Sequence, residues 1–349
     1  MTNEKRLGWI DIAKGIGIML VVLGHTIVPG LREKYDVANF LWTFIYSFHM
    51  PLFFFLSGYL FEHGLKRYAD KKRFLLSKAR KLLLPYLFFS VFAYVFIALA
   101  LKVSKLAVIL QDGGYTASSV IQALLGILSY HEHIDKHIWF CYALFVSFLL
   151  NIFLPKAMKH PAGLTVQLLL CLSTHFIGYF GILSHIARNL FFFSLARLYL
   201  DRESIRERFQ KIPFSVVSLA FFGINLIYTA LTLSSVALSA VLAVFWVTAA
   251  VLGIATVCGL SSALIQFQKT AALLSYLGNR SYDIYLMHAP FLVSGLVGIL
   301  LYYSTLPAYL ICAIVFVLGI TLPLLVSNLF VRRIPMLNTI ILGEKYKKS

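Results

Sequence analysis

Charged residues are scarce in this chain of 349 residues. They make up 13% of it, and only 14 residues are Asp or Glu. A soluble domain has about 25% charged and about 45–50% apolar residues. Here 60% of the residues are apolar and 15% are aromatic. This composition excludes a soluble enzyme, a disordered chain, collagen and a coiled coil.

Cysteine is also rare, and the spacing of the cysteines does not indicate disulfide bonds between them. The four cysteines all lie in apolar segments, and none belongs to a CxxC motif. A disulfide framework and a Cys-rich zinc site would both need regular cysteine spacing. We therefore interpret them as small apolar packing residues. They are Cys141, Cys171, Cys258 and Cys312.

Short segments of alternating polarity, which are typical of an outer-membrane barrel, are missing as well. Long apolar runs take their place, and one membrane helix needs about 20 predominantly apolar residues. The fold class that we predict is all-α, a polytopic integral membrane helical bundle in one domain, residues 1–349. The ten expected transmembrane helices are 9–28, 38–61, 82–102, 137–155, 164–180, 185–200, 213–232, 236–260, 284–303 and 306–330.

The net charge of +17 follows this topology. With ten crossings, 23 of the 31 Lys and Arg residues lie on the N-terminal side and only four on the other side. The positive-inside rule then places both termini in the cytoplasm, with 331–349 as a short basic tail. The excess charge reflects topology and a candidate site for an anionic ligand, so we expect no nucleic acid partner. The lipid bilayer is the expected surroundings.

The longest outer connection, about 103–136, contains the amphipathic stretch SVIQALLGIL. This stretch either lies along the outer surface or dips into the bundle. The first apolar run resembles a signal peptide, but it contains Asp11 and Lys14 and has no small-x-small cleavage pattern. We therefore expect it to be retained as the first span.

Ionisable residues inside a span are costly and are functional candidates. Asp11, Lys14 and His25 fall on one narrow stripe of the first span at about 100° per residue. Lys14 and His25 lie roughly 16 Å apart along the axis. One interpretation is an Asp11–Lys14 structural pair with a core histidine. The other, which we favour, is a polar path through the bundle.

Further candidates lie in later segments. His49 is near the middle of the second span, where Pro51 predicts a kinked helix. Lys78, Arg80 and Lys81 enter the third span and either bind a phosphorylated ligand or only anchor the topology. Arg188, near the outer end of the sixth span, needs an anionic partner, carbonyls or water. We favour a substrate contact there.

Two histidine-containing segments have less specific signals. His131, His133 and His137 have a spacing that zinc could use, but we expect no metal. We interpret the segment as a short exposed loop in which Glu132 and Asp135 are solvated charges. His288 lies in SYDIYLMHAP, and structural and functional roles are both open for it.

Five motifs, in order from residue 9 to residue 290, resemble acyltransferase family 3, and more closely its fucose 4-O-acetylase-like branch. They are WIDIAKGIGIMLVVLGH, FHMPLFFFLSGYLF, the basic run into KLLLPY, HIWFCYALF and SYDIYLMHAP. Three motifs differ from the family pattern, at four residues. Lys14 replaces a frequent Arg, Lys78 and Lys81 stand for Arg-x-x-Arg, and Ala196 stands where Gly is expected.

The resemblance implies a ten-helix bundle that moves an acyl group, usually acetyl, from cytoplasmic acetyl-CoA to a hydroxyl of an extracytoplasmic carbohydrate or glycan precursor. Acyl-CoA is then a co-substrate, with no bound cofactor and no metal. It also implies the bacterial cytoplasmic membrane as location, with a homodimer or a separate partner transferase left open. A transporter or flippase of a polar solute is the alternative function, and a catalytically inactive sensor or scaffold is the third.

Within this reading, His25 removes a proton from the acceptor hydroxyl, because an imidazole pKa of about 6.5 lies near working pH. Asp11 is the second catalytic candidate. Whether His25 acts as a base or becomes transiently acylated is open. The expected substrate contacts are Lys14, His49, Lys78, Arg80, Lys81, Trp139, Arg188 and His288.

Overall fold

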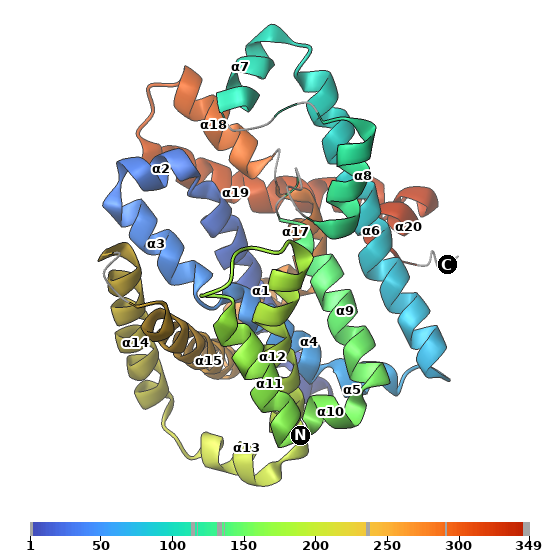
Figure 1. The fold of residues 1–349 in the computed structure, drawn as a ribbon, viewed down its shortest axis with the longest axis vertical. Helices are drawn as coiled ribbons and strands as arrows, with labels where there is room; N and C mark the ends of the chain where they lie inside the picture. The colour runs from blue at the N-terminus through green and yellow to red at the C-terminus, as the bar shows by residue number, and fades with distance from the viewer. Residues whose placement is uncertain are drawn as a thin grey trace. The chain divides into compact units, whose positions relative to one another are not determined.

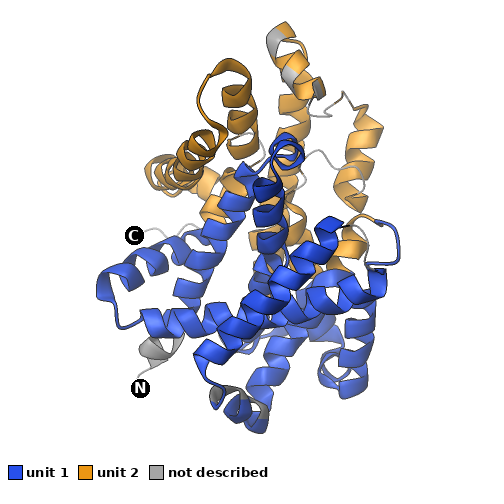
Figure 2. Ribbon diagram, turned by 90° about the vertical axis from the view of Figure 1, so that its left-hand side faces the viewer, with its two compact units in different colours: residues 1–71, 147–179, 187–281 blue, residues 72–146, 180–186, 282–349 orange. Residues whose placement is uncertain are grey.

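The computed structural model describes residues 3–112, 116, 118–130, 135, 137–234, 238–289 and 292–344, and every regular element in these ranges is helical (Figure 1). The chain forms two compact units, residues 1–71, 147–179 and 187–281, and residues 72–146, 180–186 and 282–349 (Figure 2). Each is described by itself below.

Unit 1 contains the N-terminal helices and the long helices from the middle of the chain. Helices α9 (Trp139–Phe153) and α12 (Ile182–Asp201) have residues in both units. The other helices of unit 1 are α1 (Asn3–Thr26), α2 (Pro29–Lys34), α3 (Asp36–Tyr46), α4 (His49–Tyr59), α5 (Phe61–Leu65), α10 (Pro155–Lys159), α11 (Pro161–Ser173), α13 (Glu203–Gln210), α14 (Phe214–Ser234), α15 (Ser239–Leu264) and α16 (Gln268–Asn279).

Unit 2 contains the remaining helices. They are α6 (Lys71–Ala100), α7 (Ser104–Asp112), α8 (Val120–Ser129), α17 (Ser281–Met287), α18 (Val293–Tyr303), α19 (Ala308–Val326), the π-helical turn η1 (Ser327–Val331) and α20 (Pro335–Leu342). The first residue of α6 and of α17 belongs to unit 1.

Each of the ten expected spans coincides with one helix or with a pair of helices. Among the described residues, six segments are long and apolar enough to cross a membrane: Gly8–Thr26, Asp36–Tyr59, Lys71–Ala100, Phe214–Ser234, Ser239–Leu264 and Ala308–Val331. Helices α9, α11 and α18 are apolar but shorter. The all-helical fold is confirmed and contains candidate membrane spans, whereas ten crossings with both termini in the cytoplasm stay a prediction.

The second span is broken as Pro51 predicts. Helix α3 ends at Tyr46, α4 begins at His49, and Ser47 and Phe48 lie between them. Proline has no N–H and is tolerated in the first turn of a helix. Pro51 occupies such a position in α4, and the carbonyl that it leaves without a donor belongs to Ser47, where the break occurs.

Helix α1 is the centre of unit 1 and packs against α3, α4, α15 and α16. Its contact with α16 is a backbone contact. A Cβ atom at Gly15 would overlap the carbonyl of Leu274, and one at Gly278 would overlap the carbonyl of Asp11. Helix α16 lies between two of the expected spans, in a segment that we expected to be a connection, and has 12 residues.

In unit 2, a buried carboxylate joins α17 to the C-terminal segment. Asp283 accepts hydrogen bonds from Arg332 at 2.8 and 2.9 Å and from the Ser327 hydroxyl at 2.5 Å. Arg332 also bonds Glu344 at 3.0 Å. The described part of the expected basic tail therefore contains helix α20 and a hydrogen-bonded arginine.

Replacing Gly15 by Leu should destabilise unit 1 by about 2 kcal/mol or more, since a forced side chain in a packed interior typically costs about 1–3 kcal/mol. Thermal unfolding of the detergent-purified protein measures this change. Gly223→Leu in α14 is the matched control, because nothing lies within 4 Å of a Cβ atom built there. Equal melting temperatures for the two variants would contradict the backbone contact.

Candidate functional site

A cluster of rings and one guanidinium surrounds the C-terminal end of α1. His25 lies in the last turn of α1, and its ring meets Tyr46 edge-on at 6.4 Å between centroids. Tyr46 also contacts His49 at 4.5 Å and stacks on Trp42 at 4.1 Å. The Arg32 guanidinium lies 4.0 Å from the Trp42 ring centre. We call these five residues the histidine site.

Local sequence positions each part of the histidine site. Trp42 and Tyr46 are four residues apart on α3, so their rings lie on the same face of the helix. Gly24 leaves room for Tyr46, since a Cβ atom there would come within 2.7 Å of the ring. The break after Tyr46 then brings His49 to the first position of α4.

The two histidines of the site differ in how accessible their rings are to a substrate. His49 is buried, and its Nδ1 bonds the Ile45 carbonyl at 2.9 Å. A carbonyl only accepts, so Nδ1 carries the proton in this arrangement. His25 is partly exposed. A substrate therefore reaches His25 more easily, and His25 is the better candidate for proton transfer.

Asp11 and Lys14 form an ion pair of 3.1 Å on α1, with both side chains partly exposed. The stripe on which the sequence places them also contains His25. Fourteen residues separate Asp11 from His25, about 21 Å along a helix. A direct contact between the Asp11 carboxylate and the His25 imidazole is therefore excluded. If Asp11 has a catalytic role, its carboxylate acts at a different point of α1 and not on His25.

Arg188 has an aromatic and an imidazole neighbour. Its guanidinium carbon lies 4.3 Å from the centre of the Trp246 ring, and Nη2 lies 3.5 Å from Nε2 of His175. Within the described residues no carboxylate pairs with Arg188, and its buried Nε has no acceptor. A charged donor in this state can hold an anionic or oxygen-rich ligand.

The basic run at the start of α6 contacts the C-terminal segment of unit 2. Arg80 donates from Nε to the Gly343 carbonyl at 3.1 Å. Lys81 pairs with Glu344 at 3.6 Å, and the Lys78 ammonium lies 5.2 Å from the centre of the Phe74 ring. All three expected phosphate contacts thus have protein neighbours already.

The segment expected to be an exposed loop is buried where it is described, so that interpretation is wrong. Asp135 and His137 are buried, and Nδ1 of His137 hydrogen-bonds the Asp135 carboxylate. The Tyr86 hydroxyl donates to the Ile127 carbonyl at 2.5 Å. The amphipathic helix α8 therefore reaches α6 near the start of the third span, which favours the dipping alternative over the surface one.

His288 and Trp139 belong to the same unit. The His288 ring lies 5.3 Å from the His137 ring, and its Nδ1 bonds the carbonyls of Tyr285 and Ile284. Trp139 stacks on His185 at 4.1 Å with an interplanar angle of 11°. Their substrate contacts stay predictions.

The described part of the chain contains no candidate metal site. No group of three His, Cys, Asp or Glu side chains there could hold an ion. His131 and His133 lie outside the described residues.

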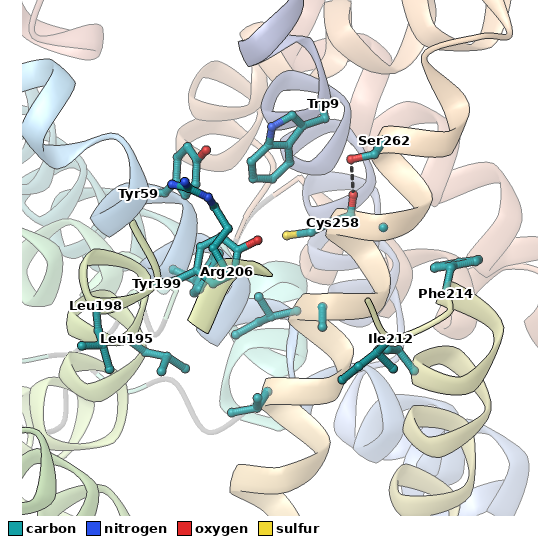
Figure 3. Close-up of a pocket in the computed structure, with 16 residues that line it drawn as sticks. Trp9, Tyr59, Leu195, Leu198, Tyr199, Arg206, Ile212, Phe214, Cys258 and Ser262 are labelled. Carbon is teal, nitrogen blue, oxygen red and sulfur yellow. Dashed lines mark hydrogen bonds between the residues drawn. The ribbon is translucent and has the colours of Figure 1, made fainter. Parts of the chain in front are cut away.

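Unit 1 also contains an apolar pocket of about 420 Å³, shown in Figure 3. Trp9, Tyr59, Tyr199 and Phe214 contribute rings to its lining, and Arg206 is its one cationic residue. Arg206 is already paired with Glu203 at 3.0 Å. The pocket thus suits a hydrocarbon chain better than an anionic group.

Arg32, Trp42 and Tyr46 are candidate residues that reasoning from the sequence missed. Their available signal was the spacing of Trp42 and Tyr46 directly before the break at Ser47. Arg32 gave no signal, because a cation in a segment between two apolar runs is unremarkable unless its position over the Trp42 ring is known.

Comparison with known proteins shows which family the chain resembles. The family model Acyl_transf_3, described as an acyltransferase domain, matches residues 7–326. Nodulation protein NolL of Sinorhizobium fredii (strain NBRC 101917 / NGR234) is 34% identical over 145 residues, which are 40% of this chain and 34% of that protein. Nodulation protein NolL of Mesorhizobium japonicum (strain LMG 29417 / CECT 9101 / MAFF 303099) is 33% identical over 151 residues, 43% of this chain and 36% of that protein.

The chain thus spans about a third of the length of these curated relatives. No solved structure gives a significant match. The family model, in contrast, covers nearly all of the chain, and helices α2 to α19 and the histidine site lie within it. This protein therefore belongs to the acyltransferase family that the model describes.

Proposed function

We propose that this protein is a membrane O-acyltransferase that moves an acyl group from cytoplasmic acyl-CoA to a hydroxyl of an extracytoplasmic carbohydrate or glycan precursor. Acetyl is the expected acyl group, and the bacterial cytoplasmic membrane is the expected location. The observation that carries the proposal is the position of His25, a partly exposed imidazole at the end of α1 beside Tyr46. Family membership supports acyl transfer as the reaction class.

In the reaction, His25 accepts the proton of the acceptor hydroxyl while the hydroxyl oxygen attacks the thioester carbonyl. A C–O bond forms, the C–S bond of the thioester breaks, and the proton passes from the imidazole to the leaving sulfur. The products are the acyl ester and free CoA. Proton transfer by a positioned side chain contributes typically about 10²–10⁴-fold to a rate.

An acyl-enzyme route is the alternative for the same residue. There the imidazole itself attacks the thioester, CoA leaves as the thiol, and the acceptor hydroxyl then takes the acyl group from His25. Burst release of CoA without acceptor would identify this route. Both routes need His25 at the same place and give the same products.

The substrates approach from opposite ends of α1 in this proposal. The basic connections that the charge pattern assigns to the cytoplasm suit the phosphates of the donor. Arg188 and the histidine site suit the acceptor. Arg32 and Arg188 are cations with no carboxylate partner among the described residues, so each can bond sugar oxygens or an anionic group of a glycan.

His25→Ala should reduce acyl transfer by about 10²-fold or more, because the variant has no group to accept the hydroxyl proton. The measurement is the transfer of radiolabelled acetyl from acetyl-CoA to glycan in membrane vesicles. His63→Ala, an exposed histidine of α5, is the control and should keep full activity. Wild-type turnover by folded His25→Ala would refute the role of His25. A wild-type chain that moves solute but leaves glycan unlabelled would support a transporter instead.

Arg188→Lys should lower kcat/KM for the acceptor by about tenfold, since lysine keeps the charge and loses the guanidinium fork. Steady-state kinetics with the lipid-linked glycan fraction of the producing cells as acceptor measures this effect. Binding of desulfo-CoA, a non-reactive analogue, should stay within about twofold of wild type, which is about 0.4 kcal/mol. Loss of analogue binding with intact acceptor kinetics would show that Arg188 serves the donor.

A further inference from the structure

Unit 1 contains a second cavity, of about 590 Å³, whose lining is rich in cations. It lies where α5, α10 and the C-terminal end of α12 meet, and Figure 1 shows α5 and α10 at the same end of the unit. We call it the basic cavity. Its lining includes one carboxylate, Glu62, and five cationic side chains, Lys71, Lys156, Lys159, Arg197 and Arg202.

Arg197 is the buried and fixed part of this cavity. Its Nη2 donates to the Glu62 carboxylate at 2.6 Å, and its Nη1 donates to the Asn151 side-chain oxygen. The guanidinium carbon lies 4.6 Å from the centre of the Phe61 ring. Its buried Nε–H has no acceptor within the part of the chain that the structure describes. The guanidinium is therefore held by protein contacts and contributes a fixed positive charge to the cavity that it lines.

Lys159 completes a small ion network at the same place. Its ammonium lies 3.1 Å from the Glu62 carboxylate and 2.6 Å from the Asp201 carboxylate. Partial burial alone would raise the pKa of the Glu62 carboxyl, but hydrogen bonds and charges from Arg197 and Lys159 lower it below its usual value. Glu62 is therefore ionised at neutral pH, and the network holds the Arg197 guanidinium in place.

The other three cations of the cavity have no such partner. Lys71, Lys156 and Arg202 form no ion pair within the described ranges. Like charges around one cavity repel one another within the Debye length of about 8 Å at physiological ionic strength. An anion with several charges would relieve this repulsion. The cavity thus combines a fixed guanidinium with three unpaired cations at its edge.

We propose that the basic cavity binds the phosphate groups of the acyl-CoA donor. This proposal rests on the proposed function, and it names the place where the donor is held. Arg202 can bind a phosphate through two parallel hydrogen bonds, and the lysines act as point charges. The buried Arg197 adds a fixed positive charge to the lining. The acyl arm of the donor then extends from the cavity toward the histidine site.

Two other basic groups suit this ligand less well. Arg80 and Lys81 are bonded to Gly343 and Glu344, and Arg206 of the apolar pocket in Figure 3 is paired with Glu203. The basic cavity also brings together three connections that the charge pattern assigns to the cytoplasmic side. These are the segments around residues 62–71, 155–161 and 202.

The test is CoA binding to the purified protein in nanodiscs of phosphatidylcholine, measured by isothermal titration calorimetry. The double variant Lys156→Gln/Arg202→Gln should weaken CoA binding by about tenfold or more, because hydrogen bonds between a cation and a phosphate are stronger than those between neutral groups. Arg208→Gln/Lys211→Gln removes the same charge from the same side outside the cavity and should bind like wild type. Arg197 is left intact because it is buried.

Equal CoA affinity for the two double variants would overturn the proposal. Stronger loss in the triple variant Lys78→Gln/Arg80→Gln/Lys81→Gln than in the cavity variant would overturn it too, and would place the phosphates at α6. Pantetheine, which lacks the nucleotide phosphates, should bind the cavity variant and wild type equally. Unequal binding of pantetheine would show a general structural defect and contradict a phosphate site.

Lipid headgroups also carry phosphate groups, so a further experiment tests whether the cavity binds the phosphates of CoA or those of lipids. Nanodiscs with added phosphatidylglycerol should leave CoA affinity within about threefold, roughly 0.7 kcal/mol. Abolished CoA binding in these discs would assign the cavity to lipid phosphate instead. His25→Ala should bind CoA like wild type. Intact CoA binding without any acyl transfer by the wild-type chain would refute the proposed function and leave the phosphate site standing.

Discussion

Backbone contact between α1 and α16 is the constraint on which unit 1 depends. Two glycines, Gly15 and Gly278, let the helices approach until each meets a carbonyl of the other. In a bilayer the hydrophobic effect gives little drive for helices to associate, and close packing of small residues takes its place. The Asp11–Lys14 pair and His25 are both on α1, so this contact sets the position of both. Gly24 repeats the principle at the other end of α1, where the neighbour is the ring of Tyr46.

The sequence was sufficient for the parts of the fold that local chemistry decides. Apolar length predicted a helix in each of the ten segments, and Pro51 predicted the break in the second. Helix α16 was missed because its length and composition resemble those of a surface helix, and only its packing on α1 shows its importance. The burial of Asp135 was missed for a related reason. A charged residue in a polar loop looks solvated until the neighbouring segments are known to fold over it.

In the candidate site, too, some residues can be predicted from the sequence, whereas the contacts between them cannot. Asp11, Lys14, His25 and His49 are visible in the sequence because ionisable residues are costly inside an apolar span. The partners that define their chemistry are contacts between segments. Tyr46 meets both histidines, and Arg32 reaches Trp42 from a different helix. Arg197 falls in the same class, since only the structure shows its partners Glu62 and Asn151.

The bonds of Asp283 have a consequence for the order in which the protein matures. Asp283 is buried, and its strongest partner, Arg332, comes 49 positions later in the chain. A buried carboxylate without its cation is costly. During synthesis, helix α17 therefore lacks the hydrogen bonds that stabilise Asp283 until α19, the π-helical turn and Arg332 have emerged. The middle of unit 2 thus depends on late-made residues, and a nascent chain that stops before residue 332 would keep an unneutralised acid at that place.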